Sequence, residues 1–140
     1  MAANSIICAV DDSASGEPVV MTAHWLAAAL GDRLIIAHVA SDPDSTAQPV
    51  VATVDGWLAG AEHETRILVG SAAPAILEEA DETGASLIVV GARGRGALRS
   101  GLLGSVSRDV AAKASCPVVV VPSTASVTEP TPTAGTPSMP

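Results

Sequence analysis

The stretch Leu87–Ser107, LIVVGARGRGALRSGLLGSVS, decides how this chain is expected to fold. Its first four residues are apolar and mostly β-branched, which is typical of a buried strand. Gly91 ends this run, a loop containing Gly94 follows, and Gly104 precedes the expected start of a helix. A strand, a glycine-rich loop and a helix start in this order leave backbone N–H groups unobstructed beside the positive end of a helix dipole. The stretch therefore predicts a phosphate-binding site.

The spacing of this stretch separates it from two common phosphate-binding loops. It reads Gly91-x2-Gly94-x9-Gly104-Ser105. The chain has no G-x4-G-K-[ST] sequence and no G-x-G-x-x-G sequence after a strand. Neither a P-loop nucleotide hydrolase nor a dinucleotide-binding Rossmann domain is indicated.

The glycine spacing resembles the nucleotide-binding motif of the universal stress protein family. The similarity extends to Ile6–Asp11 (IICAVD), to the apolar run Leu34–Val39 and to Cys116–Val121 (CPVVVV), in the family's order. The resemblance implies one domain over residues 1–122 that binds ATP or a related adenine nucleotide, with the presence of Mg²⁺ left open. It also implies a homodimer joined through the edge strand Val118–Val121.

Composition supports a small domain with a buried parallel sheet. The chain has 140 residues, which is enough for one ordinary domain. Of these residues 48% are hydrophobic, with two Trp and no Phe or Tyr. Small aliphatic side chains suit a sheet covered by alanine-rich helices, and the lack of aromatic rings disfavours a surface for stacking single-stranded bases. Residues 123–140 are rich in Ser, Thr and Pro and are expected to be a disordered tail.

Charge is distributed unevenly along the chain. The net charge of −8 disfavours nucleic acid and anionic membranes as partners. Five of the seven basic residues nevertheless fall between Gly91 and Lys113: Arg93, Arg95, Arg99, Arg108 and Lys113. They either attract phosphate groups or only keep a surface loop solvated.

The two cysteines, Cys8 and Cys116, lie in or beside apolar runs without metal-ligand spacing. Together with the lack of a signal peptide or a membrane-spanning stretch, they favour a soluble cytoplasmic protein with reduced thiols.

Apolar runs alternate with helix-permissive stretches along residues 6–121. Strands are expected over Ile6–Val10, Leu34–Val39, Glu62–Val69, Leu87–Val90 and Val118–Val121. Helices are expected over Val19–Leu30, within Val51–Ala61, over Pro74–Thr83 and over Ser105–Ala114. This alternation predicts an α/β fold with an open, doubly wound, parallel five-stranded sheet in the order 3-2-1-4-5, Rossmann-like, with helices on both faces. The segment Ala40–Val50 reads as a loop. The family usually has a longer helical connection between the second and third strands, so the second helix here should be short or irregular.

Ligands of such sheets bind at the carboxyl ends of the strands, near the switch point between the first and fourth strands. The predicted binding residues there are Val10, Asp11, Val39, Val90, Gly91, Gly94, Gly104, Ser105, Val106 and Ser107. The resemblance implies that Asp11 and Val39 lie on the adenine side. Alternatives stay open, because Asp11 and Ser105 could cap helices and the valines could belong to the core.

No catalytic set is evident. His24, His38 and His63 are widely spaced, His38 is read as structural, and no metal-ligand cluster can be assembled. The leading hypothesis is an adenine-nucleotide-binding regulatory protein of the stress response, acting through unknown protein partners. The alternatives are a nucleotide-free homodimeric interaction module of the same fold, and a slow ATPase or autophosphorylating protein.

Overall fold

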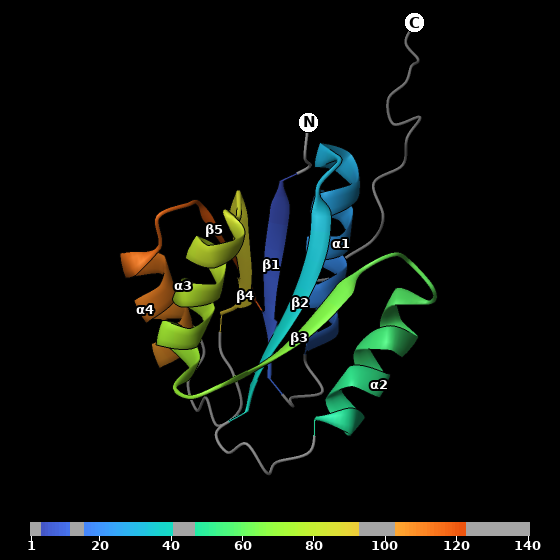
Figure 1. Cartoon of the computed structure of the whole chain (residues 1–140), viewed down its shortest axis with the longest axis horizontal. Coiled ribbons are helices and arrows are strands. Elements are labelled where there is room, and N and C mark those ends of the chain that lie inside the picture. Colours follow the sequence, from blue (N-terminus) through green and yellow to red (C-terminus); the bar gives the residue numbers. More distant parts are fainter. Residues whose placement is uncertain (1–3, 12–15, 41–46, 93–102, 123–140) are drawn as a thin grey trace, which may run out of the picture.

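The computed structural model describes residues 4–11, 16–40, 47–92 and 103–122. Over these residues, strands alternate with helices (Figure 1). The strands are β1 (Ser5–Val10), β2 (Arg33–Ala40), β3 (Glu64–Val69), β4 (Leu87–Gly91) and β5 (Val118–Val121), and the helices are α1 (Glu17–Leu30), α2 (Gln48–Leu58), α3 (Ala72–Thr83) and α4 (Ser105–Lys113).

The strands form one sheet in the order β3-β2-β1-β4-β5, and all neighbouring pairs are parallel. This confirms the predicted fold class and strand order. The central strand β1 explains why, because Ile6, Ile7 and Cys8 are completely buried. A strand that is covered on both faces carries a continuous apolar run instead of alternating polar residues.

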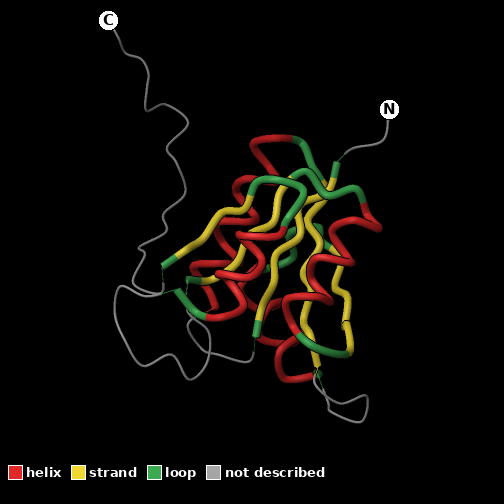
Figure 2. The backbone as a smooth tube through the Cα atoms, turned by 90° about the vertical axis from the view of Figure 1, so that its left-hand side faces the viewer, coloured by secondary structure: helices red, strands yellow, loops and turns green. Residues whose placement is uncertain are grey.

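Two helical layers cover the sheet: in Figure 1, α3 and α4 lie to the left of the strands and α1 and α2 to the right. Figure 2 looks at the molecule from that left-hand side. Ile6 and Cys8 pack into a core cluster with residues of α1 and α2, whereas Ile7 packs into a second cluster with residues of α3 and α4. Successive residues of a strand point to opposite faces. The alternation along β1 therefore divides the core into one layer on each side.

Helices α1 and α3 end at the glycines that the sequence indicates. Gly31 and Gly84 have φ angles of 71° and 63°, and their backbone N–H groups donate to carbonyls of the last turn. This left-handed conformation is strained for residues with a Cβ atom and is favoured by glycine.

Helix α2 differs from the sequence-based expectation at its start. It begins at Gln48, inside the segment predicted as a loop, with Pro49 in its first turn. Proline is tolerated there because the first N–H groups of a helix have no intrahelical acceptor. The helix is regular but short, at 11 residues. Ile67 and Val69 of the edge strand β3 are 43% and 54% exposed. The layer formed by α1 and α2 therefore covers the sheet incompletely.

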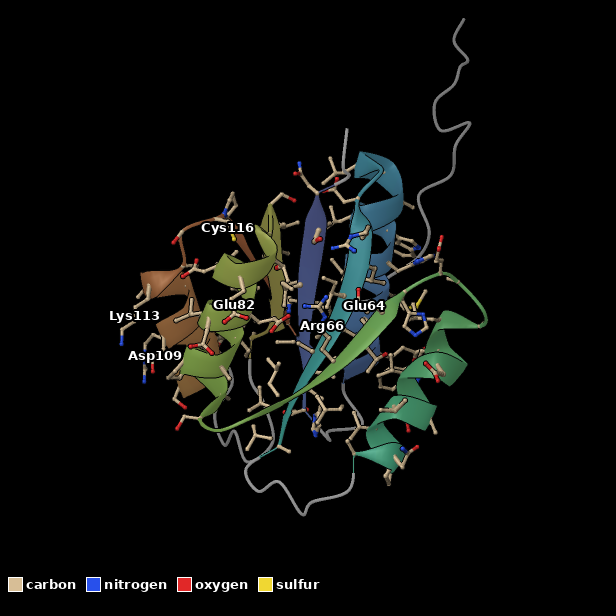
Figure 3. All side chains as sticks on the ribbon, in the orientation of Figure 1. Glu64, Arg66, Glu82, Asp109, Lys113 and Cys116 are labelled. Carbon is tan, nitrogen blue, oxygen red and sulfur yellow. The ribbon has the colours of Figure 1, made fainter. Side chains whose placement is uncertain are left out.

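An ion-pair cluster ties β3 to the opposite layer. Figure 3 shows Arg66 on β3 together with Glu64. The Arg66 guanidinium lies 2.7 Å from the Glu64 carboxylate and also bonds Glu79 of α3, whose side chain is 10% exposed. These hydrogen bonds to Glu64 and Glu79 raise the pKa of the Arg66 guanidinium above its ordinary value. The cluster satisfies a nearly buried carboxylate.

The predicted disordered tail, residues 123–140, lies outside the described residues, and the domain boundary at residue 122 stays a prediction.

Candidate functional site

The candidate site lies where β1 and β4 end side by side. The chain leaves β1 towards the layer of α1 and later leaves β4 towards the layer of α4. Cys8 is paired with Val89, and this register brings Val10 level with Gly91. Asp11, half-buried, therefore follows β1 beside the end of β4. This divergence of neighbouring parallel strands is the arrangement in which doubly wound sheets bind ligands.

The junction between β4 and α4 is closed by the backbone of Ala92. The Ala92 N–H donates to the Val121 carbonyl at 2.7 Å, and the Ala92 carbonyl accepts from the Gly104 N–H at 2.7 Å. The same carbonyl accepts from the Ser107 hydroxyl at 2.9 Å. These bonds hold the start of α4 against the carboxyl end of β4.

Two predicted donors are thus engaged within the protein. Ser107 is 2% exposed, and its hydroxyl lies 3.1 Å from the Gly104 carbonyl as well as near Ala92. The N–H of Gly104 bonds Ala92. A ligand could still be reached by the backbone N–H groups of Ser105 and Val106, which are exposed in the first turn of α4, where a helix supplies no acceptor. The N–H of Ser107 lies in the same turn, but on a buried residue. No side-chain cap covers this helix start.

The start of α4 is also accessible and electrostatically suited to an anion. Ser105 is exposed and Val106 is 36% exposed. The N-terminus of a helix carries a partial positive charge. Of the five clustered basic residues, Arg108 lies on α4 directly before the acidic Asp109, and Lys113 lies in the last turn, away from the helix start. Gly94, Arg93, Arg95 and Arg99 lie outside the described residues.

Gly104 adopts a backbone conformation that is open to any residue, with φ −69° and ψ 164°. Its lack of a side chain is therefore not needed for the turn itself. Gly104 is the N-cap of α4, where glycine is among the favoured residues, so a glycine here fits a helix cap as well as the close approach of a ligand.

The three valines predicted for the site do not form one group. Val10 packs against the cluster under α1 and α2, whereas Val39 and Val90 belong to the cluster under α3 and α4. Val90 is 3% exposed and is part of the core. Val10 and Val39 are half-buried at the strand ends.

His38 lies near the carboxyl end of β2 and forms a hydrogen bond to the neighbouring strand β1. Its Nδ1 is 3.1 Å from the carbonyl oxygen of Val10. A carbonyl can only accept, so Nδ1 carries the hydrogen. This bond fits the structural role predicted for His38.

The contributions of Ala92 could not be found from sequence, because they come from backbone atoms.

The two cysteine thiols are less acidic than a free thiol. Burial raises the pKa of the Cys8 thiol to about 12, and burial and Asp81 raise the pKa of Cys116. Within the described part of the chain, no three His, Cys, Asp or Glu side chains are placed to hold a metal ion. No helix among those residues is long and apolar enough to cross a membrane.

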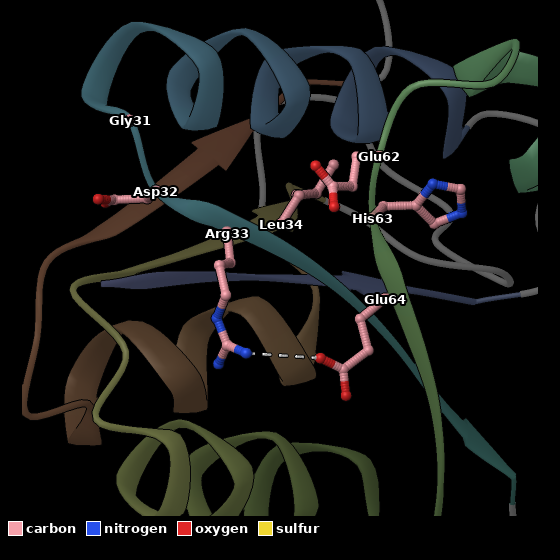
Figure 4. Close-up of a pocket in the computed structure, with 7 residues that line it drawn as sticks. All are labelled: Gly31, Asp32, Arg33, Leu34, Glu62, His63 and Glu64. Carbon is pink, nitrogen blue, oxygen red and sulfur yellow. Dashed lines mark ion pairs between the residues drawn. The ribbon is translucent and has the colours of Figure 1, made fainter. Parts of the chain in front are cut away.

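A hollow of about 410 Å³ lies at the start of β2 and β3 (Figure 4). Its lining residues are Gly31, Asp32, Arg33, Leu34, Glu62, His63 and Glu64. Arg33 lies 3.9 Å from Glu64, His63 lies 2.9 Å from Asp55, and the Ser86 hydroxyl bonds Asp32 at 3.0 Å. Because these charged groups are already paired inside the protein, the hollow offers a ligand few free charges.

The strand order and the position of α4 define the class of protein. It is a doubly wound α/β protein in which α4 starts beside the switch point between β1 and β4. The universal stress protein family model matches residues 58–122. The universal stress protein in the QAH/OAS sulfhydrylase 3' region of Thermus aquaticus is 35% identical over 133 residues, covering 84% of this chain and 97% of that protein. The chain therefore belongs to the universal stress protein family.

A second relative matches over a shorter segment. Universal stress protein YxiE of Bacillus subtilis is 47% identical over 62 residues, which are 44% of this chain. The match spans 42% of the length of YxiE.

Two solved structures share the fold along most of the chain. A universal stress protein in complex with cAMP has a TM-score of 0.73 and 31% identity, covering 89% of this chain and 100% of that one. The universal stress protein from Archaeoglobus fulgidus in complex with dAMP has a TM-score of 0.67 and 27% identity, covering 86% of this chain and 99% of that one.

Proposed function

We propose that this protein binds an adenine nucleotide at the carboxyl ends of β1 and β4 and serves a regulatory role in a stress response. The phosphate groups would be bound by the N–H groups of Ser105 and Val106. Asp11 would accept a hydrogen bond from a ribose hydroxyl or from the adenine amino group, because a carboxylate is an acceptor.

The observation that carries this proposal is the position of the helix start. Ala92 binds both Gly104 and Ser107, so the first turn of α4 is held beside the strand end before any ligand arrives. A preorganised group of donors binds an anion with little further ordering.

The bound ligands of two relatives support an adenine nucleotide over other phosphates. One relative forms a complex with cAMP and another with dAMP. We propose ATP as the first candidate for this chain, with AMP and a cyclic nucleotide as the next. Titration with and without EDTA would show whether Mg²⁺ accompanies ATP.

The decisive experiment is mass spectrometry of the supernatant after freshly purified protein has been denatured. We expect an adenine nucleotide to be released. Added nucleotide at a hundredfold excess over its Kd should stabilise the protein by about 2.7 kcal/mol and raise its Tm by several degrees. If no nucleotide is released and neither ATP, AMP nor cAMP at millimolar concentration moves the Tm, the alternative of a nucleotide-free interaction module takes its place.

We also propose a homodimer joined through β5, and a cytoplasmic location. β5 is an edge strand of four valines, three of them half-buried. An apolar strand edge is usually covered, and a second copy related by a two-fold axis would cover it.

Cys8 and Cys116 are free thiols, which suits the proposed cytoplasmic location, a reducing compartment. The alternative of slow ATP hydrolysis or autophosphorylation would be tested on the same purified protein.

A further inference from the structure

A side chain of β2 holds the last carbonyl group of β1. His38 and Val10 are register partners in the parallel pair β1–β2. The His38 Nδ1 lies 3.1 Å from the Val10 carbonyl oxygen, which accepts its hydrogen. The pairing of β1 with β4 stops earlier along the strand, at Cys8 and Val89. At its last residue, β1 is therefore held from the side of β2.

The bonded carbonyl belongs to the peptide group that carries Asp11. A peptide unit is planar, so the Val10 carbonyl and the Asp11 N–H group turn together. A hydrogen bond that fixes the orientation of this carbonyl also fixes the position of the Asp11 Cα atom. The direction of the Asp11 carboxylate then depends only on rotation about the bonds of Asp11 itself.

The same bond joins the ends of two strands that carry predicted binding residues. Val39 directly follows His38 in β2, and Asp11 directly follows Val10 at the end of β1. His38 is half-buried, which strengthens its hydrogen bond relative to one that water can reach freely. The bond keeps the two segments in place before a ligand arrives, and preorganised groups bind with a smaller loss of conformational entropy.

We propose that His38 is a positioning residue for the nucleotide site, whose Nδ1–H group holds the Val10–Asp11 peptide group in the orientation that binds the ligand. This inference rests on the proposed function. It requires no contact between His38 and the nucleotide, because one hydrogen bond and one peptide group connect the imidazole to Asp11.

The test compares three variants of the full chain by calorimetric titration with ATP and by thermal unfolding. His38→Asn keeps an N–H donor at the place of Nδ1, because both side chains have a nitrogen bonded to Cγ. His38→Gln is similar in size, but its amide nitrogen lies one atom farther from the backbone. His63→Gln is the matched control, since the Nδ1 of His63 lies 2.7 Å from the Ala61 carbonyl before the start of β3, at the opposite end of that strand from the site.

We expect His38→Gln to weaken ATP binding by about threefold to thirtyfold, the range in which residues without ligand contact modulate binding. His38→Asn should bind as the wild type does, and so should His63→Gln, even where its Tm is lower. Equal affinity of His38→Gln and the wild type, or an equal loss in either of the other variants, would overturn the inference and leave the proposed function intact. A wild type that binds no adenine nucleotide would overturn both.

A measurement on the wild type decides the matter if His38→Gln does not fold. Coupling between two equilibria is reciprocal, so a hydrogen bond that favours ATP binding must be stabilised by ATP by the same factor. The His38 Nδ1 proton, followed by NMR, should exchange with water about threefold to thirtyfold more slowly once ATP saturates the protein. An exchange rate that ATP leaves unchanged, or a His38 ring whose hydrogen lies on Nε2 alone in the ATP complex, would overturn the inference.

Discussion

The Ser107 hydroxyl of α4 lies 2.9 Å from the carbonyl oxygen of Ala92, the residue after β4. The side chain is 2% exposed, so this serine holds the fold together at the site. Ser105, two residues earlier, is exposed at the helix start. Two serines that look equivalent in the sequence thus have different surroundings.

We expect alanine substitutions to separate these two roles. Ser107→Ala leaves the Ala92 carbonyl with one donor fewer and should lower the free energy of unfolding by about 1 kcal/mol. Ser105→Ala should change that free energy by less than about 0.5 kcal/mol. If the Ser105 hydroxyl donates to a charged phosphate, its loss should weaken nucleotide binding by about tenfold or more. Urea unfolding and calorimetric titration measure both effects; a Ser105→Ala variant that loses stability but not affinity would contradict this assignment.

Gly104 permits a second separation of stability from binding. Its φ of −69° suits any residue, but Gly104 is the N-cap of α4, where Ala is less favourable than Gly, so Gly104→Ala should lower the free energy of unfolding by about 0.5 to 1 kcal/mol. A methyl group beside the first turn of α4 should hinder the approach of phosphate and weaken binding.

Gly84→Ala is the matched control for this variant. Gly84 has φ 63°, and no atom lies within 4 Å of an added Cβ, so the cost is conformational. We expect a loss of about 1 kcal/mol of stability and no change in affinity. Unchanged nucleotide binding by Gly104→Ala would show that the ligand does not approach this glycine.

The sequence predicted the sheet well, because fully buried parallel strands leave a clear pattern. After Ser5, β1 is a run of apolar residues, and β5 consists of valines alone. Helix α2 was placed too late, since Pro49 reads as part of a loop although it fits the first turn of a helix. Local sequence does not tell these two uses of proline apart.

Within the site, the sequence indicated which segments meet but not which atoms stay available. The roles of Ala92 and of the Gly104 N–H are backbone hydrogen bonds, for which no residue type is a signal. Val10 and Val90 looked alike at two strand ends, whereas the structure assigns them to opposite faces.

The two thiols should react very differently. Burial raises the pKa of Cys8 from 9.0 to about 12, and its Sγ lies 3.8 Å from the Val19 carbonyl. The thiolate is the reactive form, so a thiol reagent should modify Cys116 in the native protein and Cys8 only after unfolding.

The same shift predicts how stability depends on alkaline pH. Between pH 9 and 12 the unfolded Cys8 loses its proton while the folded one keeps it, so the contribution of Cys8 to stability is constant below pH 9 and falls as the pH rises towards 12. Cys8→Ala should show a flatter decline in denaturant midpoint over that range. If a thiol reagent modified Cys8 and Cys116 at the same rate in the native protein, the Cys8 side chain would not be buried.

The proposed dimer can be tested at one backbone position of β5. The carbonyls of Pro117 and Val121 accept from β4, at Ile88 and Ala92. Backbone groups of successive residues in a strand point to alternate sides, so Val119 faces β4 and Val120 faces away from it. Proline at position 120 therefore removes a donor from the free edge and spares the β4–β5 ladder.

We expect the wild type to be a dimer at tens of micromolar by light scattering, and Val120→Pro to be a folded monomer. Val119→Pro is the control, because it removes a donor from the ladder with β4 and should lower the Tm markedly, whatever its oligomeric state. If Val120→Pro remains a dimer with wild-type affinity between subunits, the two copies do not pair through the backbone of β5. If the wild type itself is a monomer, the homodimer proposal fails without affecting the nucleotide site, whose described residues all come from one chain.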